Sequence, residues 1–463
     1  MNMKMSDMHD TIAAVSTAWG EGGIGIIRLS GPKAIEAALG VFHPASKAPL
    51  KERYLHNGLV KDPSGADLDS ALMVFMKGPR SATGEDVAEL HCHGGPLLLK
   101  RVLGEILARG ARLALPGEFT KRAFLNGKLD LSQAEAVIDI IRAQTETALS
   151  SASGRLQGTL GRRVALIKEG LLDLLAHLEA ELDFPEDEMD GLPKEAALRV
   201  LGETGEAIRR LLLTFDEGRV TRDGIKVLIL GRPNAGKSSL LNILLMEERA
   251  IVTHVPGTTR DVIEEVVNIR GLPVRLMDTA GLRETGDFVE RMGVEAARGK
   301  IKDAGLILYV IDASAEDFEE DLLNLEGLRD KKVIVAMNKT DIAGTREVPE
   351  FGGFNVAFIS ALTADGIEVL KDGIFMEATG HAHGASQADA AEGELIVSLR
   401  HKLSLERALD GIDRARVALD KGLPRELVAT DLRSAIEGLG EITGETTTED
   451  ILDKIFENFC IGK

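Results

Sequence analysis

A chain of 463 residues with 44% hydrophobic and 28% charged residues lies in the ordinary globular range, which excludes a largely disordered protein. At roughly 150 residues per domain, this length predicts about three domains. The formal net charge of −19 and the aromatic content of 4% argue against a protein that wraps nucleic acid over its whole surface, because phosphate binding depends on Lys and Arg and base stacking on aromatic rings.

The negative charge is unevenly distributed along the chain. Residues 1–128 contain 16 Lys and Arg against 13 Asp and Glu, whereas the rest of the chain carries all the net negative charge. Extensive, unaided binding of nucleic acid is therefore not expected. Any such contact would involve the first 128 residues and nearby helices.

Cysteine content and hydropathy indicate the compartment. The only two cysteines, Cys92 and Cys460, are too few for a disulfide framework or a cysteine-rich zinc site. No apolar run approaches the roughly 18 residues needed to span a bilayer. We therefore predict a cytoplasmic protein that does not contact the membrane.

Residues 10–128 alternate short apolar runs with glycine-rich turns, which is typical of strands mixed with one or two helices. The runs Ile24–Leu29 and Leu72–Met76 predict strands, and an apolar segment, Leu97–Leu107, follows the sequence HCHGGP. We assign residues 1–128 to an N-terminal α+β domain.

From Leu129 the pattern is helical. Ser132 and Glu135 have the spacing of a capping box, in which a hydroxyl and a carboxylate satisfy free N–H groups at a helix start. From Leu156 to Leu182, apolar residues recur at steps of three and four, which predicts one long amphipathic helix. We assign residues 129–222 to the first part of a helical domain.

A mostly parallel sheet is predicted between residues 223 and 378. Short apolar runs separated by helical segments are typical of strands covered by helices on both faces. These runs are Val227–Leu230, Val274–Met277, Leu306–Ile311 and Val333–Met337.

The C-terminal region returns to helical patterning. The polar stretch Ala378–Glu394 predicts a linker. The segments Ile396–Leu419 and Leu427–Ile442 then predict helices, and we assign residues 379–463 to the second part of the helical domain. One helical domain is therefore expected to be split in sequence, with the α/β domain inserted between its halves.

A phosphate-binding loop follows the strand Val227–Leu230. The sequence GRPNAGKS at residues 231–238 contains glycines that allow backbone N–H groups to surround an anion, next to the positive end of a helix. Lys237 is expected to neutralise the β- and γ-phosphates, and the Ser238 hydroxyl to bind Mg²⁺.

A second motif, DTAG at residues 278–281, ends the strand Val274–Met277. A carboxylate at Asp278 is expected to reach the metal through water, and the N–H of Gly281 to meet the γ-phosphate. The motif is common by itself, and its position about 40 residues after the phosphate loop is what makes it informative.

The base is predicted from two further motifs. In NKTD at residues 338–341, the Asp341 carboxylate accepts both N–H donors of guanine. Adenine lacks this donor pair and would leave the carboxylate unpaired, at a cost of roughly 1–3 kcal/mol. The triplet Ser360–Leu362 suits a backbone contact to guanine O6. The four motifs in this order predict a Ras-like P-loop GTPase domain that binds GTP.

The residue that orients the attacking water is less clear from chemistry. Many GTPases place a Gln directly after the DxxG glycine, but here that residue is Leu282, which cannot form a hydrogen bond. Nearby carboxylates and arginines remain open as candidates. They are Glu284, Asp287 and Glu290 for orienting water, and Arg260 and Arg283 for offsetting developing charge.

Together these features resemble the MnmE (TrmE) family of tRNA modification GTPases, within the TrmE-Era-EngA-like P-loop GTPases. The resemblance extends over essentially the whole chain, and no second GTPase cassette or appended RNA-binding module is visible. The motifs that carry it are DTIAA at 10–14, PGEFTKRAFLNGK at 116–128, DFPED at 183–187, GRPNAGKSS at 231–239, GTTRD at 257–261, DTAGLRE at 278–284 and CIGK at 460–463. It implies a multidomain fold: an α+β folate-binding domain, a split all-α domain and an inserted G domain with a doubly wound, mostly parallel sheet.

For the G domain, the resemblance implies K⁺ beside the nucleotide in place of an arginine finger. It implies K⁺ ligands at Asn234, Thr253, Val255 and Thr258, with Thr259 joining Ser238 on Mg²⁺. It also selects Glu290 as the residue that orients water, through a second water. The implied GTP-binding residues are Asn234, Ala235, Gly236, Lys237, Ser238, Ser239, Thr253, His254, Val255, Pro256, Gly257, Thr258, Thr259, Asp278, Thr279, Ala280, Gly281, Asn338, Lys339, Asp341, Ser360, Ala361 and Leu362.

For the N-terminal domain, the resemblance implies a dimer-forming module that binds 5-formyl- or 5,10-methylene-tetrahydrofolate. Arg28, Glu89 and Lys128 are the matching positions, with Lys463 arriving from the C-terminal tail. The cations Arg28 and Lys128 could meet the glutamate tail of the folate, and the Glu89 carboxylate could pair with its pterin edge. Nothing in the sequence alone singles these residues out.

The resemblance implies a K⁺-stimulated GTPase that forms a homodimer and acts with an FAD-containing partner, MnmG. Together the two proteins add a carboxymethylaminomethyl group at C5 of the wobble uridine (position 34) of certain tRNAs. A second hypothesis remains open: a GTP-dependent conformational switch or RNA assembly factor without modification activity.

Cys460 has two open interpretations. Near a one-carbon donor its thiol is a candidate nucleophile, and an inert packed thiol is an equal alternative. Prenylation is disfavoured, because Gly462 and Lys463 do not fit the usual C-terminal box.

Overall fold

The computed structural model describes residues 10–183, 193–248, 265–277, 299–343, 349–381 and 395–463. The chain divides into two compact units. One contains the residues up to Ile138 together with Thr443–Lys463, and the other contains the segments between them. Among the described residues, no helix is long and apolar enough to cross a membrane.

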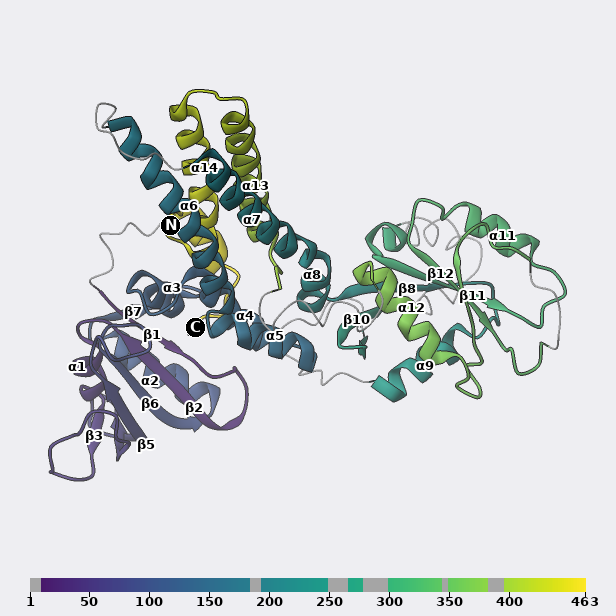
Figure 1. The fold of residues 1–463 in the computed structure, drawn as a ribbon. Helices are drawn as coiled ribbons and strands as arrows, with labels where there is room; N and C mark the ends of the chain where they lie inside the picture. The colour runs from purple at the N-terminus through teal and green to yellow at the C-terminus, as the bar shows by residue number, and fades with distance from the viewer. Residues whose placement is uncertain (1–9, 184–192, 249–264, 278–298, 344–348, 382–394) are drawn as a thin grey trace. The chain divides into compact units, whose positions relative to one another are not determined.

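The first unit is built on a seven-stranded mixed sheet (Figure 1). Only the pairing of the last two strands in its order is parallel. The order is β3 (Phe42–Pro44), β4 (His56–Lys61), β5 (Asp67–Met76), β6 (Val87–Gly94), β2 (Gly22–Ser30), β1 (Thr11–Val15) and β7 (Ala111–Leu113). The predicted strands Ile24–Leu29 and Leu72–Met76 lie within β2 and β5.

Helices pack against both faces of this sheet, because its strands place alternate side chains on opposite faces. On one face, α1 (Ala34–Leu39) and α2 (Pro96–Leu107) bury a core with residues such as Ala13 and Leu90. On the other face, Phe119 of α3 (Glu118–Leu125) packs with Ile12 and Ala14 of β1.

The C-terminal segment belongs to the same unit. Helix α15 (Glu449–Phe456) shares a core with α4 (Leu131–Arg142), and Lys121 of α3 pairs with Asp453 at 2.6 Å. The tail continues to the sheet, where Ile461 forms an antiparallel bridge with Pro116. The last residues of the chain are therefore held against the segment that joins β7 to α3.

The start of α4 corrects one expectation. The helix begins at Leu131, before Ser132, so the predicted Ser132–Glu135 capping box does not cap it. Instead the Asp130 carboxylate accepts the N–H of Gln133 at 2.8 Å, and the Gln133 side chain accepts the N–H of Asp130 at 2.9 Å. The Asp130 carboxylate also accepts the Ser132 hydroxyl at 2.6 Å, so Ser132 supports the cap from inside the helix.

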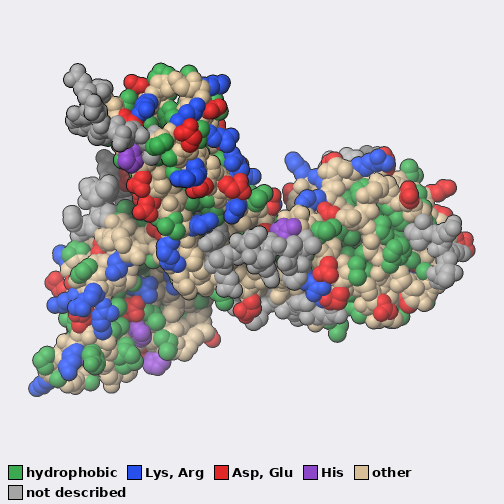
Figure 2. Space-filling view, in the orientation of Figure 1, with side chains coloured by type: hydrophobic (Ala, Val, Ile, Leu, Met, Phe, Trp, Pro, Cys, Tyr) green, Lys and Arg blue, Asp and Glu red, His purple; other side chains and the backbone are tan. Residues whose placement is uncertain are grey.

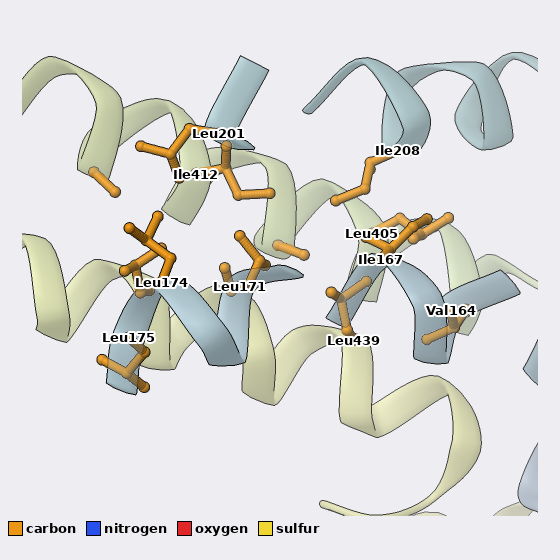
Figure 3. Close-up of a cluster of buried hydrophobic side chains, with 14 of the residues drawn as sticks. Val164, Ile167, Leu171, Leu174, Leu175, Leu201, Ile208, Leu405, Ile412 and Leu439 are labelled. Carbon is orange, nitrogen blue, oxygen red and sulfur yellow. The ribbon is translucent and has the colours of Figure 1, made fainter. Parts of the chain in front are cut away.

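In the second unit, helices from both sides of the G-domain segment share one core. Figure 3 shows their apolar side chains pointing toward one another. The four long helices are α6 (Thr159–Asp183), α7 (Lys194–Leu213), α13 (Leu399–Asp420) and α14 (Arg425–Thr443). The same unit contains two shorter helices, α5 (Glu146–Leu156) and α8 (Phe215–Asp223).

The long helix predicted from Leu156 is wrong at its start. Leu156 is the last residue of α5, and α6 begins only at Thr159. Gly158 between them has a φ of 80°, a left-handed conformation that glycine adopts without strain and that ends a helix. Periodicity alone continues across this break because Leu160 resumes the apolar spacing.

The G-domain segment forms a six-stranded sheet in which only β9 runs antiparallel. The order is β13 (Asn355–Phe358), β12 (Val333–Asn338), β11 (Leu306–Asp312), β8 (Ile225–Leu230), β10 (Leu272–Met277) and β9 (Glu265–Ile269). Helices α9 (Lys237–Glu248) and α12 (Ile367–Thr379) pack on one face and α11 (Glu319–Glu326) on the other. All four predicted strands are present, and the sheet is mostly parallel as expected. Most of the predicted linker, residues 382–394, lies outside the described residues.

Candidate functional site

The phosphate loop joins the end of β8 to the start of α9, as the motif predicts. Gly231 and Gly236 have φ values of 139° and 96°, which L side chains rarely adopt. A β-carbon at Gly231 would overlap the carbonyl oxygen of Val310, and one at Gly236 would overlap the side-chain amide of Asn338. Both glycines are therefore required by packing as well as by backbone conformation.

The Lys237 ammonium lies against the loop that precedes it. It donates to the carbonyl oxygens of Gly231 and Arg232, each at 2.7 Å. These bonds hold the positive charge beside the backbone that is expected to surround a phosphate. Ser238 and Ser239 follow in the first turn of α9.

Asn338 links the phosphate loop to the base-binding loop. Its side-chain N–H₂ donates to the carbonyl oxygen of Ala235 at 2.9 Å, and its side-chain oxygen accepts the N–H of Ala361 at 2.9 Å. One buried amide therefore fixes the relative position of two loops that are more than 100 residues apart in sequence.

The predicted guanine-binding residues lie together at the carboxyl ends of β12 and β13. The Asp341 carboxylate accepts the Ser360 hydroxyl at 2.6 Å, which orients it. Lys339 has a φ of 66° and pairs with Asp312 at 2.6 Å. Leu362 is 84% exposed. This edge of a parallel sheet is where ligands bind in open α/β folds.

Arg232, in the phosphate loop, forms an anchor that sequence reasoning missed. Its guanidinium lies 3.0 Å from Glu320 and 3.4 Å from Asp321, both in α11. The hydroxyl of Tyr309, in β11, donates to Asp321 at 3.2 Å. Burial raises the pKa of Asp321, while its hydrogen bonds to Tyr309 and Arg232 oppose that rise. No motif marks this contact, because Asp321 lies 89 residues from Arg232.

Several predicted G-domain residues lie outside the described residues. These are Thr253, His254, Val255, Pro256, Gly257, Thr258, Thr259, Asp278, Thr279, Ala280, Gly281 and Glu290, with the alternatives Arg260, Arg283, Glu284 and Asp287. Their roles therefore stay predictions.

In the N-terminal domain, Arg28 and Glu89 lie opposite each other in the register of β2 and β6. The Arg28 guanidinium donates to Glu89 at 2.8 Å, and it lies 5.9 Å from the centre of the Phe119 ring. His91, two residues after Glu89 in β6, also contacts that carboxylate at 3.3 Å. Sequence reasoning did not identify His91 as a partner, although its i+2 spacing places it on the same face.

The other two predicted folate residues belong to the same unit. The Lys128 ammonium donates to the carbonyl oxygen of Pro79 at 3.1 Å. Lys463 ends a tail in which its N–H donates to the Cys460 carbonyl at 3.3 Å. Among the contacts of the described residues, none joins either lysine directly to the Arg28–Glu89 pair, although Gly462, next to Lys463, lies against Val15, the β1 partner of Ile27 in β2.

A cavity of about 580 Å³ lies in the first unit and contains Lys128 but not Arg28, Glu89 or Lys463 in its lining. Its other walls come from the end of α3, the turn before α4 and the segment before α15. The lining residues are Lys121, Phe124, Leu125, Gly127, Lys128, Leu129, Asp130, Gln133, Thr443, Gly444, Glu445, Thr447, Glu449 and Leu452.

The two thiols differ in their surroundings. Cys92 is buried in the sheet core, and burial together with the charge of Asp69 raises its pKa to about 12, so it is not a nucleophile at neutral pH. Cys460 is exposed, next to Ile461 of the tail bridge.

Comparison with known proteins gives matches over nearly the whole chain. The family described as "GTP-binding protein TrmE N-terminus" matches residues 11–128, and "MnmE helical domain" matches residues 131–460. A protein of Geotalea uraniireducens named tRNA modification GTPase MnmE is 48% identical, over 98% of this chain and 100% of its own length. Proteins with the same name from Geobacter sulfurreducens and Aquifex aeolicus are 48% and 46% identical over the same shares.

Proposed function

The chain belongs to the MnmE family of tRNA modification GTPases, and from this premise we propose that it binds GTP with Mg²⁺ and hydrolyses it during the modification of tRNA. The observation that carries the nucleotide assignment is the pair of hydrogen bonds at the Asn338 amide, which donates to the Ala235 carbonyl and accepts the N–H of Ala361. These two bonds hold the phosphate loop and the base-binding loop together as one site.

In this site Lys237 neutralises the β- and γ-phosphates, and Asp341 accepts the two N–H donors of guanine. Ser360 keeps Asp341 oriented through its 2.6 Å hydrogen bond. The Ser238 hydroxyl and Thr259 hold Mg²⁺, which supplies charge stabilisation for phosphoryl transfer.

K⁺ is the proposed second ion of the site. Asn234 fits this role because it is exposed, has a φ of 62° and makes no side-chain hydrogen bond within the part of the chain that the structure describes. Its amide oxygen is a hard donor suited to such an ion. Thr253, Val255 and Thr258 would complete the coordination, and the bound cation would offset charge on the transferred phosphoryl group.

Two measurements test the hydrolytic mechanism. GTP hydrolysis in K⁺ should exceed that in Na⁺, and Asn234→Ala should remove the difference; equal rates in both salts would contradict the K⁺ assignment. Glu290→Ala should abolish turnover while retaining GTP affinity, because the residue orients water and does not bind nucleotide. Weakened binding with normal turnover would contradict that role.

The proposed modification is the addition of a carboxymethylaminomethyl group at C5 of uridine 34, together with the FAD-containing partner MnmG. The one-carbon unit comes from tetrahydrofolate in the N-terminal domain, which also joins two copies into a homodimer. The paired Arg28 and Glu89 fit a ligand that has both a carboxylate tail and a hydrogen-bonding ring edge. Lys128 and Lys463 would add positive charge.

The alternative is a GTP-dependent switch with a folate pocket that no longer works. Analysis of tRNA nucleosides distinguishes the modification enzyme from the switch. The measurement compares a deletion strain with the same strain after the chain has been reintroduced. Loss and recovery of the modified wobble uridine supports modification. An unchanged profile supports the switch.

A further inference from the structure

A group of exposed cations lies on the N-terminal domain, outside both sites described above. We call Lys51, Arg53, Lys77 and Arg80 the basic patch; all four side chains are exposed. The space-filling view shows Lys and Arg side chains, in blue, on the visible face of this domain at lower left (Figure 2). The domain is also the part of the chain where basic residues outnumber acidic ones.

Backbone and side-chain contacts bring the patch together from two segments. The Arg53 guanidinium donates to the carbonyl oxygen of Arg80. The backbone N–H of Lys77 donates to the Glu52 carboxylate at 3.3 Å, and that of Arg53 to the Phe75 carbonyl at 2.9 Å. The loop before β4 is therefore fastened to the turn after β5.

Little carboxylate charge opposes the patch. Arg53 pairs with Glu52 at 3.5 Å, whereas Lys51, Lys77 and Arg80 form no ion pair with any described residue. The nearby Asp86 accepts the N–H of Gly78 at 2.9 Å, and Glu85 accepts from Ser30 and Arg122. Arg122 offsets the charge of Glu85, whereas Asp86 and Glu52 keep theirs; the four cations of the patch outnumber these two carboxylates, so the patch keeps a net positive charge.

An aromatic ring and a candidate ligand site adjoin the patch. Tyr54 is 62% exposed, and the Lys51 ammonium lies 5.6 Å from the centre of its ring. Lys128, a proposed folate residue, contacts the carbonyl of Pro79, directly before Arg80. Cations beside an exposed aromatic ring are the combination that binds phosphates and stacks bases in nucleic-acid sites.

We propose that the basic patch binds the phosphate backbone of tRNA and holds it next to the folate-binding face of the N-terminal domain. The proposal rests on the proposed function, in which tRNA is the substrate. The acidic remainder of the chain repels RNA, so binding is confined to this patch and depends strongly on salt.

The test uses the full-length chain and a labelled tRNA transcript, with binding followed by fluorescence anisotropy at about 50 and 200 mM salt. The variant is Lys51→Gln/Lys77→Gln/Arg80→Gln. Its affinity should fall by roughly tenfold or more at the higher salt, and its log–log salt slope should become shallower by about 2 to 3. GTP hydrolysis should not change.

A matched control removes the same number of exposed cations elsewhere in the same domain, as Lys33→Gln/Lys100→Gln/Arg101→Gln. These residues lie beside or in α1 and α2, and all are exposed. The control should alter tRNA affinity by less than about twofold, since it contributes only to the general field.

Three results would overturn the proposal. The first is no tRNA binding by the unaltered chain at low salt, and the second is an equal loss of tRNA affinity in both triple variants. The third is a loss of self-association in the patch variant, measured by sedimentation, which would assign the patch to a second copy of the chain. The failure of the proposed function is read separately, from the wobble nucleoside in a deletion strain carrying the unaltered chain. If the unaltered chain restores the modified wobble nucleoside but the patch variant binds tRNA as tightly as the unaltered chain, only the role of the basic patch is rejected.

Discussion

The nucleotide loops of the G domain and the sheet face of the N-terminal domain are built in different ways. The nucleotide residues come in short motifs at the ends of parallel strands, and Asn338 joins two of those loops through one amide. Arg28 and Glu89 meet only because β2 and β6 are in register, 61 residues apart.

This difference has a physical cause. A phosphate needs several backbone N–H groups from consecutive residues, so its binding loop is local and leaves a recognisable motif. A ligand held by side chains on an antiparallel sheet needs only correct placement across strands, which distant residues supply equally well. We expect substitutions to affect the two regions accordingly.

The largest effect is expected for Gly236→Ala, which tests how strictly the local loop depends on its tertiary contact. The new β-carbon would displace the Asn338 amide in a backbone conformation that alanine adopts only with strain. Together these costs reach about 3 kcal/mol or more, which is a loss of GTP affinity of roughly a hundredfold. Binding of a fluorescent GTP analogue measures it. Gly373→Ala in α12, where a β-carbon makes only ordinary contact, should bind as the unaltered chain does.

Next is Arg122→Gln, which tests the framework of the N-terminal domain. Arg122 is fully buried and pairs with Asp10 and Glu118. Removing it leaves Glu118 buried with less compensation, at a cost of about 3–5 kcal/mol. Unfolding in urea, followed by the fluorescence of Trp19, the only tryptophan, reports this unit. Arg109→Gln, at a half-buried pair, should cost less than about 1 kcal/mol.

The Arg122 effect should depend on pH. Burial opposes ionisation of Glu118, but hydrogen bonds and charge from Arg112, with the charge of Arg122, outweigh it and hold the pKa of Glu118 below its ordinary value of 4.5. The stabilisation is therefore present above pH 4.5 and lost as pH falls through the lowered value. The difference between the two chains should shrink in acid; a constant difference would contradict this origin.

A smaller effect is expected for Arg232→Met, which removes the anchor between the phosphate loop and α11. We expect GTP affinity to fall by about three- to tenfold with kcat little changed, because the anchor positions the loop without touching the nucleotide. Arg270→Met is the control, since it breaks a similar pair with Asp372 away from the loop. Equal losses of affinity in both variants would indicate general destabilisation.

The smallest effect on stability is expected for Glu89→Gln. The pair with Arg28 is partly exposed, so the free energy of unfolding should change by less than about 1 kcal/mol. Folate binding, measured by calorimetry, should nevertheless weaken. His93→Gln, in the same strand, should leave it unchanged; equal weakening in both would remove Glu89 from the site.

The sequence predicted four of the six strands of the G-domain sheet, where continuous apolar runs report burial directly, but only two of the seven strands of the N-terminal sheet. It failed where one local contact outweighed the pattern. The apolar spacing from Leu156 continues through the left-handed turn at Gly158, and Asp130 caps α4 in place of Ser132.

The sequence by itself determined the nucleotide loops, since backbone anion binding requires glycines at set spacing, and it located the basic residues within the first 128. Only the tertiary structure decided which distant side chains meet: Arg232 with Asp321, His91 with Glu89, and Arg53 with Arg80. Such pairs depend on strand register and loop packing, which leave no spacing in the sequence. The −19 charge therefore describes the whole chain, whereas tertiary contacts concentrate the basic patch on one part of it.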